Sequence, residues 1–217
     1  MKRKTAKTFL AALGTLTAFA LWTVVVLLVD VQAIGPNGSA VGLATINNAV
    51  HSLFGVHMSL YTITDWLGLV PVGVGFGFAV LGLVQWISRR HILKVDFSIL
   101  VLGGFYLVVL AAYLLFESVV INYRPILING YLEASYPSST TMLVLCVMPT
   151  AVMQLKPRIK SRGLLQCVTA IIAAFTVFMV IGRVISGVHW LTDIVGGCLL
   201  STGLVLLYDA VSHMQRT

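Results

Sequence analysis

The sequence predicts an all-α protein, a bundle of helices that crosses a membrane several times. Of its 217 residues, 59% are hydrophobic and 10% are charged, and a soluble domain could not build a charged surface from this composition. Apolar runs of about 20 residues recur along the chain, long enough for a helix to cross a hydrocarbon core of about 30 Å. Most basic residues stand at the ends of these runs. We therefore expect one membrane-embedded domain over residues 1–217.

Six transmembrane helices are predicted, one for each long apolar run. They cover Thr8–Val29, Leu67–Ile87, Phe97–Leu115, Thr141–Leu155, Leu164–Ile185 and Ile194–Tyr208. The first run precedes Val31-Gln-Ala33, which has the form of a signal-peptide cleavage site, but its 22 residues exceed the about 7–15 of a signal-peptide core. We therefore expect this run to be retained as a span. The fifth run is expected to stop near Val180 or Ile181, before the charged Arg183.

The segment 30–66 is predicted to form a short amphipathic helix on the outer side of the membrane. It begins with turn-forming residues, Ile34-Gly-Pro-Asn-Gly38. Apolar residues then recur at helical spacing: Val41, Leu43, Ile46, Val50, Leu53, Phe54, Val56 and Leu60. Such a helix either lies in the membrane interface or packs as a lid over the bundle.

The basic residues predict the orientation. Twelve of the fourteen lysines and arginines form four clusters, at 2–7, 89–94, 156–162 and 216. Six spans place all four clusters on one side, which is then cytoplasmic. Both termini are expected on that side, in a multi-pass protein of the cell membrane. The net charge of +7 therefore follows from membrane topology and does not indicate a nucleic-acid partner.

The two remaining arginines, Arg124 and Arg183, fall on the opposite, extracytoplasmic side. Arg183 lies six residues before His189, and the intervening Ser186-Gly187 permits a bend that would turn them toward each other. A guanidinium presents a planar fork of donors suited to phosphate oxygens. The alternative for both arginines is a contact with lipid headgroups.

His189 and Asp193 are four residues apart, so they share one face of a helix. A carboxylate there can fix the imidazole tautomer and leave the other ring nitrogen as a nucleophile. The alternative is a structural pair that caps the last span. Ser138, Ser139 and Thr140 precede the fourth span, where they either cap a helix or help its N-terminus to bind an anion.

These segments resemble, in order, the three signature motifs of the type 2 phosphatidic acid phosphatases. That superfamily includes lipid phosphatases and vanadium haloperoxidases, and its patterns are K-x6-R-P, P-S-G-H and S-R-x5-H-x3-D. The third pattern is matched by Arg183, His189 and Asp193, with glycine at the position of its serine. The first is matched at Arg124-Pro125 but has Glu117 at the lysine position, and the second reads Pro-Ser-Ser-Thr over 137–140.

The resemblance implies a role for each residue. His189 would be the nucleophile that forms a phosphohistidine, and Asp193 would orient it. The phosphate would be bound by Arg124, Arg183, Ser138 and the backbone amides of Ser139 and Thr140. The resemblance implies no metal or other cofactor, and the sequence shows no metal-ligand spacing. Its three cysteines lie in apolar runs and predict neither a metal site nor a disulfide framework.

Thr140 stands where the family has the histidine that protonates the leaving oxygen. Threonine cannot act as an acid near pH 7, and general acid help is worth about 10²–10⁴-fold. A phosphate leaving group, with a second pKa of about 6, needs less help than an alkoxide. A polyprenyl diphosphate such as undecaprenyl diphosphate is therefore the expected substrate. Glu117 is a possible substitute acid, with His51 and His57 as further candidates.

The sequence thus predicts a metal-independent phosphatase of lipid phosphates or diphosphates that acts at the extracytoplasmic face. The main alternative is a family member that binds lipid phosphates without turnover, because two motif positions are changed. A lipid transporter or scramblase is a third reading, and the scarcity of polar residues within the spans argues against it. A haloperoxidase is the least favoured reading, because that branch is typically soluble.

Overall fold

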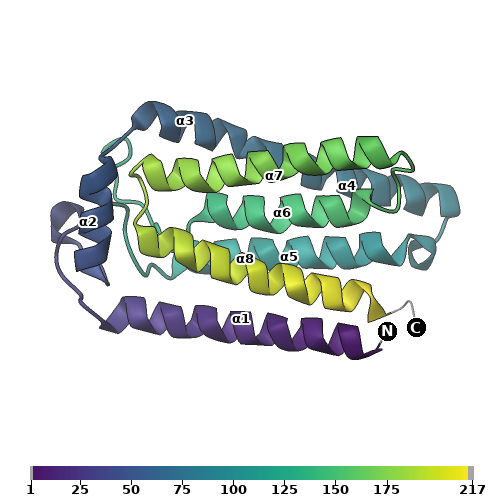
Figure 1. Ribbon diagram of the computed structural model, residues 1–217, viewed down its shortest axis with the longest axis horizontal. Coiled ribbons are helices and arrows are strands. Elements are labelled where there is room, and N and C mark those ends of the chain that lie inside the picture. Colours follow the sequence, from purple (N-terminus) through teal and green to yellow (C-terminus); the bar gives the residue numbers. More distant parts are fainter. Residues whose placement is uncertain (1, 215–217) are drawn as a thin grey trace.

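In the computed structural model of the protein, residues 2–214 are described, with side chains from Thr5 onward. These residues form eight α-helices and no β-strand. The helices are α1 (Lys2–Leu28), α2 (Ala44–Phe54), α3 (Met58–Leu67), α4 (Leu69–Arg89), α5 (Phe97–Ser118), α6 (Ser139–Leu155), α7 (Arg162–Ile185) and α8 (Leu191–Ser212). All but α2 run along the long axis of the molecule, whereas α2 lies across one end (Figure 1).

Five helical segments are long and apolar enough to cross a membrane. They are Thr5–Leu28, Met58–Arg89, Phe97–Ser118, Arg162–Ile185 and Leu191–Ser212. The predicted six spans correspond to these five and to α6, which is apolar but has 17 residues. Large apolar side chains such as Leu21, Phe76, Leu107 and Ile171 are more than 60% exposed on these spans. A protein in water would not expose so much apolar surface, so the chain is a multi-pass membrane protein.

The shorter α6 packs against four other helices, α4, α5, α7 and α8. Its inner face meets α5 and α8 in a cluster that includes Leu102, Phe105, Met142, Cys146, Leu204 and Tyr208. Small residues allow α8 to come close: a Cβ on Gly196 would lie 2.6 Å from the Tyr136 ring, and a Cβ on Gly197 would lie 3.2 Å from Thr141 Cγ2. The start of α6 is thereby held against the start of α8, where the candidate motifs lie.

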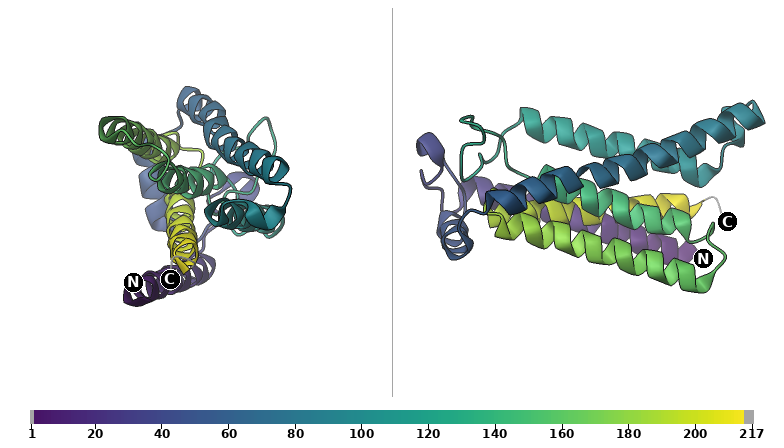
Figure 2. Two further views of the ribbon diagram at one scale, coloured as in Figure 1. Left: turned by 90° about the vertical axis from the view of Figure 1, so that its right-hand side faces the viewer. Right: turned by 90° about the horizontal axis from the view of Figure 1, so that it is seen from above.

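The prediction of one amphipathic helix in 30–66 is corrected by the structure. Two helices form there, because Gly55 adopts a positive φ of 69° and ends α2. α3 does not lie across the end of the bundle, as α2 does, but runs beside α7 and leads at Gly68 into α4 (Figures 1 and 2). Gly182 of α7 permits this packing, since a Cβ there would lie 2.8 Å from Thr64 Cγ2. The second span therefore begins earlier than predicted, at Met58.

The predicted end of the fifth span near Val180 or Ile181 is also corrected. α7 continues to Ile185, with Arg183 buried inside its last turn. The charge is tolerated because Asp65 of α3 forms an ion pair with it at 3.0 Å. A helix can carry an arginine in an apolar run when a carboxylate on a neighbouring helix neutralises it.

The two ends of the bundle differ in what they carry. The first described residue and the last turn of α8 lie at one end, together with the α4–α5 and α6–α7 connections (Figure 1). The segments 119–138 and 186–190 lie at the other end, next to α2 (Figures 1 and 2). The basic connections and the candidate motifs are thus separated by the full length of the bundle, as the sequence predicted.

Candidate active site

His189 lies in the tight turn between α7 and α8 and is 5% exposed. Gly187 forms this turn with a positive φ of 67°. A Cβ on Gly187 would lie 1.9 Å from the carbonyl oxygen of Gly55. Glycine is therefore required both by the positive φ and by the lack of space for a side chain. The backbone N–H of His57 donates to the carbonyl of Ser186 at 3.0 Å and joins the two turns. The α2–α3 connection therefore fixes the position of the histidine.

Ser135 bridges His189 and Asp193, which the sequence predicted to pair directly. The Nδ1 atom of His189 lies 3.8 Å from Asp193 Oδ2, beyond hydrogen-bond distance. The Ser135 hydroxyl lies 2.9 Å from this Nδ1 and donates to the same Oδ2 at 2.5 Å. A carboxylate accepts hydrogen bonds and donates none, so the single hydroxyl proton points to Asp193. Ser135 then accepts from Nδ1–H, and the lone pair of His189 lies on Nε2.

The buried Asp193 carboxylate is held by partners from three parts of the chain. Besides Ser135, the backbone N–H of Trp190 donates to Oδ2 at 2.9 Å and the Asn122 amide donates to Oδ1 at 3.3 Å. Asp193 also lies in the first turn of α8, where the helix dipole favours a negative charge. A buried carboxylate with this many donors is fully satisfied, which makes it a rigid support for the histidine.

Arg124 and Arg183 converge on one aromatic ring. Their guanidinium carbons lie 5.8 and 5.1 Å from the centre of the Tyr61 ring, so both cations contact the same part of α3. Arg124 comes from the loop after α5, and its Nε lies 3.0 Å from Glu133 Oε2. Two segments more than 50 residues apart in sequence therefore bring their positive charges to one place.

Three residues of this cluster carry buried polar atoms without a hydrogen-bond partner. These atoms are Nη1 of Arg124, Nε and Nη1 of Arg183, and Nε2 of His189; Nε of Arg124 also lacks a hydrogen bond but lies in the ion pair with Glu133. Buried polar atoms are nearly always paired, and unpaired ones at one place indicate a ligand. Three free donor nitrogens on two cations, together with a free imidazole lone pair, fit an anion with several oxygen atoms, such as a phosphate group.

His189 is electrostatically suited to be a neutral nucleophile. Its pKa is lowered from 6.5 to about 4, chiefly by burial; Asp193 acts against this shift, and the positive charges of Arg124 and Arg183 contribute to it. The imidazole is therefore unprotonated at pH 7. An unprotonated Nε2 that points toward a bound anion can attack phosphorus.

The segment before α6 is placed as the sequence predicted, but its residues have different roles. The Ser138 hydroxyl caps α6 by accepting from the backbone N–H of Thr141 at 3.5 Å, and the Ser138 N–H donates to the carbonyl of Asp193 at 3.0 Å. Thr140 accepts a hydrogen bond from Nη2 of Arg183. Ser139 is partly exposed at the first position of the helix. The helix N-terminus thus joins the arginine cluster through Thr140.

The three candidates for a substitute acid lie outside this cluster of contacts. Glu117 is exposed near the end of α5 and lines a narrow pocket with Ser135 and Ser139. The ion pair of Arg124 is formed with Glu133, not with Glu117. His51 packs against Trp190, with 5.5 Å between ring centres, and burial lowers its pKa. His57 is exposed and bonds to a backbone carbonyl.

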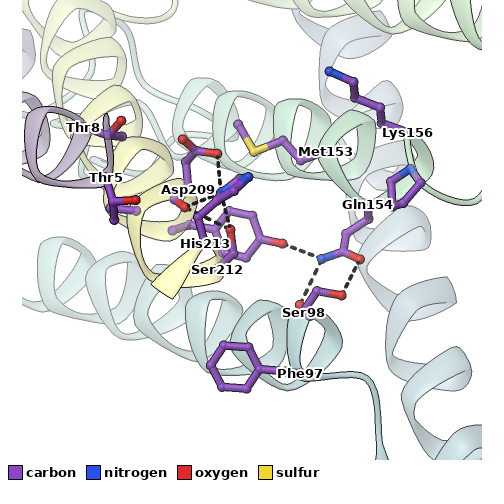
Figure 3. A pocket seen from close by; sticks show the side chains of 13 residues that line it. Thr5, Thr8, Phe97, Ser98, Met153, Gln154, Lys156, Asp209, Ser212 and His213 are labelled. Carbon is purple, nitrogen blue, oxygen red and sulfur yellow. Dashed lines mark hydrogen bonds and ion pairs between the residues drawn. The ribbon is translucent and has the colours of Figure 1, made fainter. Parts of the chain in front are cut away.

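A larger cavity, of about 580 Å³, lies at the opposite end of the bundle (Figure 3). Gln154 connects its walls by donating to the Tyr208 hydroxyl at 2.5 Å and to the Ser98 carbonyl at 2.9 Å. His213 bonds to the backbone of Asp209 at 2.8 Å (Figure 3). Gln154 and His213 are thus paired within the protein, and the cavity lies where the ends of α5, α6 and α8 meet.

Tyr61, Asp65, Glu133 and Ser135 are functional candidates that the sequence motifs did not reveal. Each is recognised by its contact with a motif residue: the first three with the arginines and Ser135 with His189. Among the described residues, no group of three or more His, Cys, Asp or Glu side chains could hold a metal ion. The site is therefore built from two cations, a histidine, a buried carboxylate and hydroxyl groups.

Comparison with known proteins agrees with the motifs. Residues 116–216 match the sequence profile of the PAP2 superfamily. The crystal structure of the first transmembrane PAP2 type phosphatidylglycerolphosphate phosphatase from Bacillus subtilis has a similar fold, with a TM-score of 0.54 and 20% identity over 94% of this chain and 96% of that chain. No curated protein matches the chain. The segment that holds all three motifs thus matches the PAP2 superfamily, and the chain shares its helical fold with a transmembrane PAP2 type phosphatase.

Proposed function

We propose that the protein is a membrane phosphatase that removes a phosphate group from a lipid phosphate or diphosphate through a phosphohistidine on His189. One observation carries this proposal. The Nε2 atom of His189 is buried and unpartnered, and the same is true of N–H donors on Arg124 and Arg183. A nucleophile and a cationic cradle are thus present together without any group of the protein to occupy them.

The first chemical step follows from this geometry. The lone pair of Nε2 attacks phosphorus while the two arginines bind the phosphate oxygens and stabilise the charge that develops on them. The P–O bond to the leaving group breaks, and the leaving group departs with the electron pair. Positive charge on the ring is stabilised by Asp193 through Ser135, which accepts the hydrogen bond from Nδ1–H. The product of this step is phosphorylated His189.

A polyprenyl diphosphate is the favoured substrate. Thr140 contacts Arg183 but cannot supply a proton near pH 7. A leaving group that is itself a phosphate departs without strong acid help, because its second pKa is about 6. Glu117, which lies beside Ser135 and Ser139, is the carboxyl group proposed from the motifs to assist departure of other leaving groups.

The extracytoplasmic face is the proposed place of the reaction. The site lies at the end of the bundle opposite the basic connections, and basic connections mark the cytoplasmic side. Lipid-facing apolar side chains surround the bundle, so a lipid substrate could present its headgroup to the site while its chains stay in the bilayer. Membrane lipids therefore surround the bundle and also include the proposed substrate.

Release of inorganic phosphate by purified protein tests the proposal. The substrates compared are a polyprenyl diphosphate, phosphatidic acid and phosphatidylglycerol phosphate, with wild type and His189→Ala. We expect fastest release from the diphosphate and loss of at least about 10³-fold in the variant, as for other nucleophile deletions. Faster release from the monoesters contradicts the substrate assignment. Tight binding of all three without turnover by the wild type supports the alternative of a non-catalytic lipid-phosphate binder, which the change at Thr140 favours.

A further inference from the structure

The guanidinium of Arg183 has one occupied side and one free side. Its Nη2 donates to Asp65 Oδ1 at 3.0 Å and to the hydroxyl of Thr140, whereas Nε and Nη1 are buried without partners. The free side is the part of the phosphate cradle described above. Asp65 and Thr140 therefore lie beside the cradle, one guanidinium group away from the bound phosphate.

Asp65 differs from the other polar groups around Arg183 in its exposure at the surface of the bundle. Its side chain is 56% exposed, whereas that of Arg183 is 1% exposed. It is carried by α3, which runs beside α7 and is fixed to it by the close contact at Gly182. A carboxylate in this position can meet a water molecule that enters the site and can return a proton to the solvent.

The proposed reaction needs such a group in its second step, and this inference rests on the proposed function. Phosphorylated His189 has phosphorus on Nε2 and Ser135 on Nδ1, so the imidazole cannot activate water. Asp193 is fully buried, and its oxygens accept from three donors. Thr140 is a hydroxyl group and cannot take a proton near pH 7.

Three carboxyl groups remain near the site, and Asp65 is the best placed. Glu133 binds Nε of Arg124, on the stem side of that guanidinium, and the same residue's backbone carbonyl accepts from the Arg124 backbone N–H at 3.0 Å. Glu133 thus joins two parts of the loop between α5 and α6 to each other. Glu117 lines the pocket beside Ser135, whereas Asp65 binds the tip of a cradle arginine directly.

We propose that Asp65 is the general base that activates water to hydrolyse the phosphohistidine. The carboxylate takes a proton from water as the water oxygen bonds to phosphorus. The P–Nε2 bond breaks, its electron pair returns to His189, and inorganic phosphate leaves. Asp65 then releases its proton to solvent. A carboxylate in this role explains how a chain with threonine at position 140 completes the reaction.

Trapping of the covalent intermediate tests this role. Wild type and Asp65→Asn are mixed with farnesyl diphosphate carrying ³²P in its terminal phosphate, in detergent micelles, and quenched with alkali, which preserves phosphohistidine. We expect the variant to release one farnesyl monophosphate per protein in a burst and to retain ³²P, while steady turnover falls by about 10²–10⁴-fold. The wild type should retain little label, and Asp65→Glu should recover part of the turnover.

A purely structural role for Asp65 predicts a different result. If Asp65 serves to hold Arg183, the asparagine variant loses the burst itself and binds orthovanadate, a phosphate mimic, more weakly than the wild type. That outcome overturns the inference, and so does wild-type turnover in Asp65→Asn. Accumulation of label in Glu117→Gln or Glu133→Gln, with none in Asp65→Asn, assigns the base elsewhere.

The remaining controls separate this inference from the proposed function. Asp209→Asn, at the far end of α8, should turn over like the wild type. A wild type that releases phosphate, combined with an Asp65→Asn variant that traps no label, removes the inference and leaves the proposed function. A wild type that yields neither phosphate nor label removes both.

Discussion

At the scale of single residues, the account depends on which nitrogen of His189 carries the proton. Ser135 decides this, because its one hydroxyl proton is committed to Asp193. Burial then keeps the ring neutral, and Nε2 stays free for attack. A direct pair, as predicted from the sequence, would give the same tautomer but would leave Ser135 without a function.

Replacement of Ser135 by alanine tests the bridge. We expect kcat to fall about 10- to 100-fold, which is the loss usually seen when a residue that fixes the tautomer of a metal-binding histidine is removed. The arginine cradle is unchanged in this variant, so the affinity for orthovanadate should stay within about twofold, a shift worth less than 0.5 kcal/mol. Steady-state kinetics and vanadate inhibition measure the two quantities. An unaltered kcat contradicts the bridging role.

The pH dependence of kcat/KM tests the neutral state of His189. Attack requires the unprotonated ring, and the pKa of His189 is lowered to about 4. Activity should therefore persist as the pH falls through 6.5 and should be lost as it falls through about 4. The pH profile is measured with two substrates whose phosphate groups have different pKa values. A limb of the profile that stays at the same pH for both substrates belongs to the enzyme. An enzyme limb near pH 6.5 contradicts the buried, neutral histidine.

The same lowered pKa gives the sign of the effect on stability. His189 has an ordinary pKa of 6.5 when unfolded and a pKa of about 4 when folded, so below pH 6.5 the unfolded chain binds the proton first. The contribution of this residue to stability is therefore full above pH 6.5 and decreases as the pH falls toward 4.

The site residues found from the sequence and those missed differ in how far they lie, along the sequence, from the residues that they contact. His189 and Asp193 were found because four-residue spacing on a helix is a local signal. Ser135 is 54 residues from His189, and Asp65 is 118 residues from Arg183. No local pattern encodes such contacts, because they arise when α3 packs beside α7 and when the loop before α6 packs on the start of α8.

At the scale of helices and turns, the α7–α8 connection is the most constrained element. Gly187 has a positive φ and faces the Gly55 carbonyl at a distance that excludes a side chain. The helices themselves were predictable, because long apolar runs specify spans. The break at Gly55 and the continuation of α7 through Arg183 were not, because each depends on a neighbouring helix.

Replacement of Gly187 by alanine tests this constraint, with Gly38→Ala as the matched control. Both glycines have a positive φ, but only Gly187 has a close neighbour. Alanine at 38 should cost about 1–2 kcal/mol of backbone strain, and alanine at 187 should add about 1–3 kcal/mol of steric overlap. In detergent, we expect a clearly lower Tm and at least tenfold slower phosphate release for Gly187→Ala. Equal Tm values for the two variants contradict the account of the turn.

At the scale of the whole molecule, the residues of the candidate site and the basic residues that predict the orientation lie at opposite ends of the bundle. The candidate site and α2 lie at one end, and the start of α1, the end of α8 and the basic connections lie at the other (Figure 1). This division was predictable because it needs only the order of spans and the positions of lysine and arginine. The depth of the site was not, since it depends on how α6 is enclosed by its neighbours.

Cysteine labelling tests the orientation. After the three native cysteines are replaced by alanine, a single cysteine is introduced at Ala40, near α2, or at Lys160, in the α6–α7 connection; both positions are exposed. In intact cells, a membrane-impermeant maleimide should label Ala40→Cys and should label Lys160→Cys only after the cells are opened. The reverse pattern would place the site in the cytoplasm.

The position of phosphate on the His189 ring tests the central claim most directly. Protein mixed with ³²P-labelled farnesyl diphosphate is quenched within milliseconds, digested under alkaline conditions and mapped by mass spectrometry against the two phosphohistidine isomers. The account predicts phosphate on Nε2 of His189, because Nε2 is the unpartnered nitrogen and Nδ1 is bound to Ser135. Phosphate on Nδ1, phosphate on another residue, or turnover that continues in His189→Ala would contradict it.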